Sequence, residues 1–521
     1  MEKVGYIAVA AIATGVVVRS LRGISKSKKR EVTVSSNAKG GLTQYLVDNN
    51  NNVDGLKEHA IAYAACNGIV MAQDLKAGTF VHSPVALTPF EVPKAVFEQA
   101  QDIATLFNTL VDRVSRDFEF LSTTLAPLLD SDDFTRHLFS ILETVEKEGR
   151  CQEWVCGINR SDYMIHEYLD ETTGKKQSRA LQVELNTIAA SFAGLSGQIT
   201  KMHQYLLSRH CPAHFDAKRV PPNAGVRGLA ETLRNACSAN DDGSGHCPVV
   251  LKVVLPNETN IADHRLLEHS LWNDYGVKLI RRSLTECAAR ASLHPTTRDL
   301  QIDGVRVSVV YFRSGYVPQH FPTESEWGAL ELIERSHSIK CPSVAYHLAG
   351  SKKVQQQLAA AGVLERFLPA RDCARLRTCF AGLWGLDADD EATRQVIQSA
   401  IAHPDKYVLK PSREGGGNNF YGEELSKKLL AMPLSERKAF ILMQRITPAE
   451  QVAVLLKGGN HVIVPSVSEL GIYAGYVGDG NQVMFNQLLG QLLRTKQSGV
   501  DEGGVASGYA VLSSPYLVDK F

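Results

Sequence analysis

A lysine, a glutamate and three consecutive glycines stand close together near residue 410, and these residue types suit the binding of phosphate groups. Lys410 ends a short β-rich run, and Glu414 and Gly415–Gly416–Gly417 follow within the next seven residues. Glycines carry no Cβ, so their backbone N–H groups can close on phosphate oxygens that a side chain would keep away. Lys410 adds a positive charge, and the Glu414 carboxylate offers the hard oxygen that magnesium prefers. The stretch 407–425 therefore predicts a site for nucleotide phosphates.

A plain loop is the alternative for this stretch, because Gly-Gly-Gly-Asn-Asn also suits a hairpin or a linker. The familiar nucleotide motifs are absent from the sequence. There is no G-x-x-x-x-G-K-[ST], and the triple glycine does not complete G-x-G-x-x-G because Phe420 stands at the last position. The H-R-D and D-F-G motifs of kinases are missing as well. Nucleotide chemistry here requires a different fold.

Composition indicates an ordinary soluble globular enzyme. The 521 residues allow roughly two to four domains, and 56 basic residues balance 56 acidic ones. This neutral balance gives no electrostatic footprint for nucleic acid. The ten cysteines form no C-x-x-C pair, which fits a reducing compartment. His210, Cys211 and His214 could suggest a soft metal site, but the sequence has no second cluster at ligand spacing.

The N-terminus carries an apolar, uncharged segment at residues 4–18, followed by six basic residues between Arg19 and Arg30. Fifteen residues are fewer than the roughly 20 that cross a bilayer comfortably. Positive charge after the apolar segment favours a signal-anchor with the body of the protein on the cytosolic side. The alternative is a loose extension or a helix packed on the body. We expect a cytoplasmic protein, tethered to a membrane if the segment acts as an anchor.

The next segments organise the chain rather than carry chemistry. Residues 31–56 are polar and rich in asparagine and read as a linker. From about 56 to 149 the pattern is helical, with apolar residues such as Val96, Ala100 and Ile103 at three- and four-residue intervals. This spacing predicts core-forming helices.

Residues 181–192 predict a strand with a polar face. Gln182, Glu184 and Asn186 alternate with apolar residues, so in a strand all three project to one side. A carboxylate and an amide oxygen two residues apart can share a magnesium ion. A solvated strand face is the alternative, unless Glu414 completes the coordination.

Residues 248–350 alternate strands and helices and predict a compact α/β domain. The apolar run 249–256 suits a buried parallel strand, further strands are expected at 277–280 and 305–312, and helices at 263–275 and 324–338. Polar residues follow these strands, at the edge where ligands of open α/β sheets collect. We therefore interpret this segment as a substrate domain. These polar residues are Glu258, Asn260, Arg313 and Tyr316.

The C-terminal part contains a second glycine-rich loop. A strand is expected at 440–446, a strand pair at 462–477 and a hairpin turn at 478–481. Arg494 and Lys496 stand just before the glycines of the stretch 492–508. This combination predicts a mobile lid over an anionic ligand.

From about residue 56 to its end, the chain resembles the eukaryotic glutathione synthetase family. The stretches that carry the resemblance are NRSDYM, QVELNTIAASFAGL, VVYFRSGY, LAGSKKVQQQL, KPSREGGGNNFYGEEL, SELGIY, LLRTK and GGVASG. The resemblance implies an α/β (α+β) protein with an ATP-grasp fold, an inserted parallel α/β substrate-binding domain and a helical N-terminal region. The domains it implies are an extension at 1–40, a helical region and first part of the body at 41–247, the insertion at 248–350, and the ATP-grasp domain with its lid loops at 351–521.

The resemblance also implies a reaction and its partners. ATP, γ-glutamylcysteine and glycine give glutathione, ADP and phosphate, with magnesium (two ions per site) and in a homodimer. The cysteinyl carboxylate first takes the γ-phosphoryl group as an acyl phosphate, which needs positive charge around the transferred oxygens. Three alternatives stay open: the same ligase with another amine such as β-alanine, a catalytically silent nucleotide-binding relative, and a membrane-tethered interaction protein.

Site residues carry over position by position. The implied magnesium ligands are Glu184, Asn186 and Glu414, and the implied catalytic residues are Arg160, Lys410 and Arg494. The implied substrate-binding residues are Arg160, Ser191, Glu258, Asn260, His264, Arg313, Tyr316, Arg494, Val505 and Ala506. The implied ATP-binding residues are Glu184, Lys352, Lys410, Arg413, Gly415, Gly416, Gly417, Asn418, Asn419, Tyr421, Met443, Ile446, Glu469, Lys496 and Glu502.

Three positions depart from the animal pattern of this family. Ala189 stands in place of a serine, His264 in place of a glutamine and Glu502 in place of an aspartate. We expect these departures to change the affinity for substrate or nucleotide more than the type of reaction.

Overall fold

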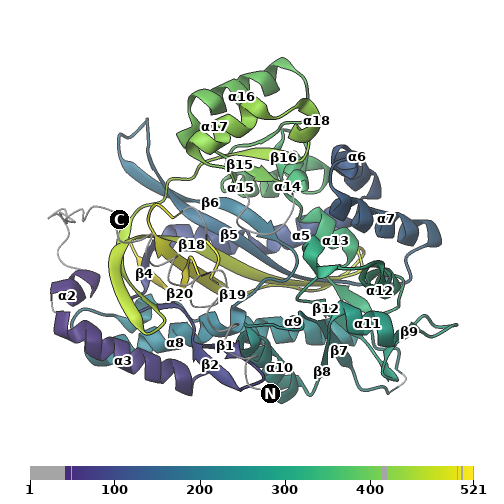
Figure 1. Ribbon diagram of the computed structural model, residues 1–521, viewed down its shortest axis with the longest axis horizontal. Coiled ribbons are helices and arrows are strands. Elements are labelled where there is room, and N and C mark those ends of the chain that lie inside the picture. The colour runs from purple at the N-terminus through teal and green to yellow at the C-terminus, as the bar shows by residue number, and fades with distance from the viewer. Residues whose placement is uncertain are drawn as a thin grey trace, which may run out of the picture. The chain divides into compact units, whose positions relative to one another are not determined.

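The computed structural model describes residues 42–48, 50–243, 245–412, 419–500, 503–505 and 508–519 (Figure 1). The expected anchor at 4–18 lies outside them. Among the described residues, no helix combines the length and the apolar character needed to cross a bilayer. Residues 42–521 form one compact unit, and the domain boundaries expected within it remain predictions.

A seven-stranded, largely antiparallel sheet forms the centre of this unit, in the order β17-β3-β20-β19-β18-β5-β6. Its long strands bury both faces, because side chains alternate along a strand. From β18, Leu470, Ile472 and Ala474 point into one core with helix α5, while Tyr473 and Val477 point into a second core with α8 and α9. The bounds are β3 (Val85–Ala86), β5 (Val155–Leu169), β6 (Lys176–Asn186), β17 (Gln451–Lys457), β18 (Asn460–Gly478), β19 (Val483–Gln497), β20 (Val511–Ser513), α5 (Ala104–Arg116), α8 (Ala193–His210) and α9 (Gly225–Ala239).

The α/β elements expected in residues 248–350 are confirmed. A four-stranded parallel sheet in the order β13-β12-β7-β8 lies there, with its carboxyl edge formed by the ends of β7 and β12. The stretch 305–312 contains two short strands, β11 and β12, rather than one. The elements are β7 (Val249–Val253), α10 (Ile261–Tyr275), β8 (Lys278–Arg282), α11 (Leu284–Arg290), β9 (Ala291–Leu293), β10 (Leu300–Ile302), β11 (Val305–Arg306), β12 (Val309–Phe312), α12 (Glu324–Glu334), β13 (Ile339–Cys341) and α13 (Val344–Ala349).

A separate three-stranded antiparallel sheet, in the order β14-β16-β15, carries Lys410 and Met443, two of the residues expected to hold a nucleotide. Helices α16 and α17, at the top of Figure 1, pack on this sheet through a small apolar core of their own. The strands expected at 407–409 and 440–446 are confirmed. The elements are α14 (Lys352–Ala359), α15 (Ala370–Arg377), β14 (Leu383–Gly385), α16 (Glu391–Ala402), β15 (Tyr407–Pro411), α17 (Gly422–Ala431), α18 (Leu434–Arg437) and β16 (Phe440–Gln444).

The N-terminal expectations were partly wrong. The expected linker at 31–56 contains helices from residue 42 onward, and four short strands interrupt the helical region at 70–93. β3 pairs with β17 and β20, and β4 with β21, so partners more than 360 residues away impose these strands on the local pattern. The elements are α2 (Leu42–Asp48), α3 (Asn50–Cys66), β1 (Val70–Asp74), β2 (Thr79–His82), β4 (Phe90–Pro93), α4 (Lys94–Asp102), α6 (Phe118–Leu129), α7 (Asp133–Glu148) and β21 (Pro515–Val518).

The expected strand pair at 462–477 was also wrong, because β18 runs unbroken through it. The hairpin turn after it is confirmed. The Asp479 carboxylate accepts hydrogen bonds from the backbone N–H groups of Asn481 and Gln482 and fixes the turn between β18 and β19.

A substitution at Gly157 of β5 tests how tightly the central sheet packs against its neighbours. A Cβ at this position would overlap the phenol ring of Tyr346, which is fully buried in α13. We expect Gly157→Ala to lower the free energy of unfolding by about 1–3 kcal/mol, because the buried ring cannot move aside without strain. Urea unfolding measures the change. Gly55→Ala in α3, where a Cβ meets nothing within 4 Å, is the matched control and should not destabilise the protein. Equal effects at the two positions would contradict this packing.

Candidate active site

A cavity of about 840 Å³ lies between the central sheet and the three-stranded sheet. Strands β5, β6, β18 and β19 line one side, and β15 and β16 line the other. Most residues expected from the sequence to bind the nucleotide and the metal face this one space. Of the expected site residues, it brings together Arg160, Glu184, Asn186, Ser191, Tyr316, Lys352, Lys410, Asn419, Tyr421, Met443, Ile446, Glu469, Arg494, Lys496 and Val505.

The Asp162 carboxylate lies at the centre of the charged groups and is fully buried. It accepts two hydrogen bonds from Arg160, at 2.6 Å to Nε and 2.7 Å to Nη2. Its Oδ2 also accepts from Arg494 Nη2 at 3.0 Å and from Asn186 Nδ2 at 3.1 Å. One buried carboxylate therefore fixes the direction of two arginines and one amide. Asp162 was not predicted from the sequence.

The strand register explains this convergence. Arg160 and Asp162 are two residues apart on β5 and so project to the same face. Glu469 of β18 pairs directly with Arg494 of β19, and the two side chains form an ion pair. The spacing of Arg160 and Asp162 within NRSDY was the available signal for Asp162.

Burial and the neighbouring charges shift the pKa values of these side chains in opposite directions. Burial lowers the pKa of Arg160 and of Arg494, but the neighbouring carboxylates more than compensate, so both guanidinium pKa values are raised. Burial also raises the pKa of the Glu469 carboxyl, against the opposing charge of Arg494. Both arginines therefore stay charged.

Glu184 lies in a strongly positive environment. Lys352 Nζ is 3.9 Å from its Oε2, and Lys410 Nζ donates to the carbonyl oxygen of the adjacent Val183 at 3.2 Å. Burial raises the pKa of Glu184, but the charges of Lys352, Lys410, Arg494 and Arg160 outweigh it and lower this pKa to about 2. Glu184 is therefore an ionised, hard-oxygen donor that faces lysines.

The expectation for the polar face of β6 was correct for Glu184 and Asn186, which line the cavity, but not for Gln182. A bulge between Gln182 and Glu184 leaves Val183 without a partner in the register. The extra residue breaks the alternation. The Gln182 amide instead donates to the Ser161 hydroxyl at 2.7 Å.

Four other expected residues, Glu258, Asn260, His264 and Arg313, lie close together at the carboxyl edge of the parallel sheet, where His264 and Arg313 line a small hollow. Arg313 donates to Ala190 O at 2.7 Å and to Ser191 Oγ at 2.5 Å, and its Nε donates to His264 Nε2 at 3.2 Å. Since Nε2 of His264 accepts, its Nδ1 carries the hydrogen. Among the described residues, neither this N–H nor the buried Oδ1 of Asn260 has a hydrogen-bond partner. The fourth residue, Glu258, lies 3.8 Å from His264 through its Oε2.

Ser191 joins the two spaces and sits in a constrained loop. Ala189 and Phe192 on either side of it adopt left-handed backbone angles, with φ of 52° and 74°. The Asp263 carboxylate accepts from the N–H groups of Phe192, Gly194 and Leu195 and holds this loop at the start of α8. Asp263 was also missed, because nothing local signals a contact across some seventy residues.

The remaining expected residues lie outside the part of the chain that the structure describes. They are Arg413, Glu414, Gly415, Gly416, Gly417, Asn418, Glu502 and Ala506. Their roles stay predictions.

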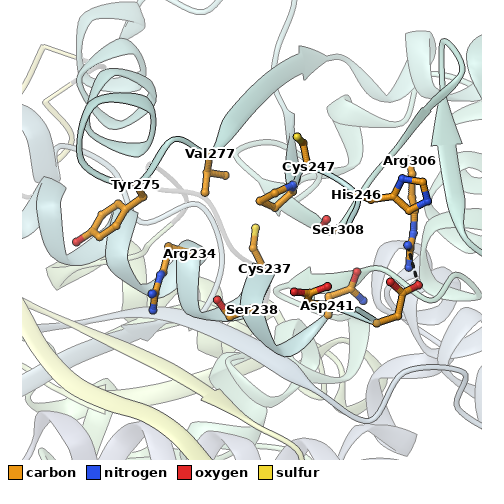
Figure 2. Close-up of a pocket in the computed structure, with 13 residues that line it drawn as sticks. Arg234, Cys237, Ser238, Asp241, His246, Cys247, Tyr275, Val277, Arg306 and Ser308 are labelled. Atoms are coloured by element: carbon orange, nitrogen blue, oxygen red, sulfur yellow. Dashed lines mark hydrogen bonds and ion pairs between the residues drawn. The ribbon is translucent and has the colours of Figure 1, made fainter. Parts of the chain in front are cut away.

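A separate cavity, of about 210 Å³, lies at the opposite, amino edge of the parallel sheet (Figure 2). Its lining comes from the end of α9, the following loop, α10 and β11, and includes Cys237, Asp241, Tyr275 and Arg306. No residue expected in the site contributes to it, and Arg306 is paired with Asp242 and Asp299. The expected site residues gather in the larger cavity instead.

The three-stranded sheet, the long central sheet and the lysine- and carboxylate-lined cavity between them define an ATP-dependent ligase with an ATP-grasp fold. Comparisons with known proteins agree. Residues 50–517 match the model of the eukaryotic glutathione synthase ATP-binding domain. The chain belongs to the eukaryotic glutathione synthase family, and it is an ATP-dependent ligase.

Relatives in plants and animals span nearly the whole chain. The chloroplastic glutathione synthetase of Solanum lycopersicum is 42% identical over 478 residues, which cover 89% of this chain and 84% of the relative. The glutathione synthetase of Homo sapiens is 39% identical over 480 residues, which cover 91% of this chain and 98% of the relative. A glutathione synthetase-like effector from Globodera pallida has a similar fold, with a TM-score of 0.71 at 23% identity over 90% of this chain and 97% of that one.

Asp162→Asn tests the central carboxylate. We expect it to lower the free energy of unfolding by about 3–5 kcal/mol, because it leaves the buried Arg160 without its charged partner. Asp389→Asn, which removes an exposed ion pair with Arg394, is the control and should cost less than about 1 kcal/mol. Chemical denaturation of both variants provides the comparison. A change at Asp162 no larger than the change at Asp389 would show that the cluster does not hold Arg160.

The lowered pKa of Glu184 predicts a pH dependence. The folded state favours the ionised carboxyl, so its contribution to stability is complete above the ordinary pKa of 4.5 and is lost as the pH falls towards about 2. We expect Glu184→Gln to be less stable than the wild type at pH 7, and the difference to narrow as the pH drops below about 4.5. Urea unfolding of both proteins across this range measures it. A difference that stays constant with pH would contradict the proposed charge environment.

Proposed function

We propose that this chain joins the cysteinyl carboxylate of γ-glutamylcysteine to the amine of glycine, forming glutathione while ATP is converted to ADP and phosphate. The observation that carries the proposal is the convergence in one cavity of three lysines, two hard-oxygen donors and a buried arginine. Beside them, Arg313 donates to Ser191 from the group of polar residues at the carboxyl edge of the parallel sheet.

The first step transfers the γ-phosphoryl group. A carboxylate oxygen of the dipeptide attacks the γ-phosphorus, the bond between phosphorus and the ADP oxygen breaks, and an acyl phosphate forms. This transfer needs positive charge around the phosphoryl oxygens and little covalent chemistry from the protein. Lys352, Lys410 and Lys496 line the cavity and supply that charge.

The second step forms the amide bond. The free amine of glycine attacks the acyl carbon, the bond to phosphate breaks and the amine loses a proton. Negative charge develops on the acyl oxygen, and donors held in advance at that position stabilise it. Arg160 is the proposed donor, because Asp162 fixes its guanidinium before substrate arrives.

Glu184 and Asn186 fit a magnesium site. Both line the cavity, and their carboxylate and amide oxygens are the hard donors that magnesium prefers. We propose that they hold magnesium together with Glu414. When bound, the ion neutralises charge on the phosphate oxygens of ATP.

We assign the γ-glutamyl end of the dipeptide to the polar residues at the carboxyl edge of the parallel sheet. The N–H of His264 and the Oδ1 of Asn260 lack partners among the described residues, and an α-amino acid group brings both an acceptor and a donor to satisfy them. Arg313 and Glu258 add one charge of each sign. The small side chain of Val505 lines the main cavity, and we assign this wall, with Ala506, to the glycine site.

The assembly and location of the protein belong to the same proposal. We propose a homodimer in the cytoplasm, with a membrane contact only if residues 4–18 act as an anchor.

A direct assay tests the reaction. Purified protein is incubated with ATP, magnesium and γ-glutamylcysteine, with glycine or with β-alanine, and ADP release and the tripeptide mass are followed. We expect glutathione with glycine. Product only with β-alanine would reassign the acceptor, and no product from folded, ATP-binding protein would refute the ligase.

Arg160→Ala and Glu414→Ala in the same assay should lower kcat by about 100-fold or more, as loss of a group that stabilises developing charge does. Thermal unfolding confirms that each variant is folded. Near-wild-type turnover in either variant would remove that residue from the mechanism.

A further inference from the structure

Two histidines meet where helix α3 packs on helix α8. Nδ1 of His59 lies 2.7 Å from Nε2 of His210, with ring centroids 4.8 Å apart and ring planes at 59°. The two histidines are 151 positions apart in the sequence. Neither ring takes part in the reaction proposed above.

Packing beneath the rings fixes the two helices. Leu56 and Ala60 of α3 belong to the same buried core as Leu206 and Leu207 of α8. His59 lies between the first pair and is itself exposed, and His210 is the last residue of α8 and is half-buried. The scaffold therefore sets the separation of the two helices, and the hydrogen bond between the rings holds the two side chains in contact.

The local motif that contains His210 does not form a site by itself. Cys211 is buried, and His214 stacks on Tyr45 with centroids 4.0 Å apart. The second nitrogen at ligand distance comes from α3 instead. A sequence search limited to nearby residues could not have found it.

We propose that His59 and His210 form a binding site for one borderline divalent transition-metal ion, such as Zn²⁺, Ni²⁺ or Cu²⁺. At 2.7 Å the two nitrogens share one hydrogen, so one of them already presents a lone pair to the other. Metal–nitrogen bonds of about 2.0–2.1 Å at angles of about 90–110° place two ligand nitrogens roughly 2.9–3.4 Å apart. The two nitrogens point at each other, so each ring must tilt as well as separate by less than about 1 Å before both lone pairs face one ion.

Two neutral imidazoles can bind the ion without net release of a proton. The hydrogen between the rings moves to the outer nitrogen of the ring that donated it, and both facing lone pairs then ligate. Burial and the neighbouring His59 and Arg209 lower the pKa of His210. The Arg209 guanidinium itself donates to the Tyr205 hydroxyl at 3.0 Å.

The ligand set determines the kind of ion and the kind of site. Imidazole nitrogen suits zinc, nickel and copper, whereas magnesium prefers oxygen. Within the described ranges, no group of three histidine, cysteine or acidic side chains could hold a metal. Water therefore completes the coordination, as in an open and exchangeable site rather than a closed structural one. Binding ties α3 to α8 and stabilises the folded chain.

The test uses untagged full-length protein without nucleotide or magnesium. Titration with Zn²⁺ should raise Tm in a saturable manner. With one equivalent of Cu²⁺, electron paramagnetic resonance should show coupling to two nitrogens. Tm that does not respond to Zn²⁺, or copper bound without nitrogen, would refute the site.

Three variants locate the ion. His59→Gln and His210→Gln should each weaken Zn²⁺ binding by about tenfold or more, because each removes half of the protein ligands. His214→Gln, four residues from His210, should bind as the wild type does. A Zn²⁺-dependent rise in Tm that persists unchanged in both His59→Gln and His210→Gln would overturn the proposal by placing the ion elsewhere.

Discussion

The site depends on the hydrogen bonds that the buried Asp162 carboxylate accepts from Arg160 and Arg494. Arg160 is almost fully buried and Arg494 is largely so, and a guanidinium removed from water is costly unless a carboxylate compensates it. Asp162 compensates both, with help from Glu469 for Arg494. The same contacts turn two flexible side chains into fixed donors, so in the proposed mechanism stability and chemistry rest on one group. Positive charge that is fixed in advance needs no rearrangement when negative charge develops on a substrate.

The sequence predicted the parts of the site that local chemistry signals. Lys410, Glu184 and Asn186 stood out because their residue types and spacing suit phosphate and magnesium, and all three line the cavity. Asp162 and Asp263 were missed because their importance comes from partners on other elements. The parallel sheet was predictable, since its apolar strands and amphipathic helices alternate along the chain. The strands between residues 70 and 93 were not, because some of their pairing partners lie hundreds of residues away.

Two binding spaces meet at a single loop. Arg313 reaches Ser191 from the parallel sheet, and the Tyr473 hydroxyl donates to the Ser191 carbonyl from the central sheet. The left-handed residues Ala189 and Phe192 hold the loop in a conformation that most side chains avoid, and such strain persists only where surrounding contacts enforce it. The relative position of the two spaces is therefore set by the fold rather than by either ligand.

Strand β18 has a consequence for how this sequence can change its length. It runs for 19 residues and pairs along its course with β17, β19 and β5. An insertion or deletion of one residue within it would turn every later side chain to the opposite face and separate Glu469 from Arg494. The turns at its two ends, which contain Gly459 and Gly480, can absorb added residues without this effect. Within the stretch from β17 to β19, changes of length are therefore expected in those turns, and β18 between them is expected to change by substitution.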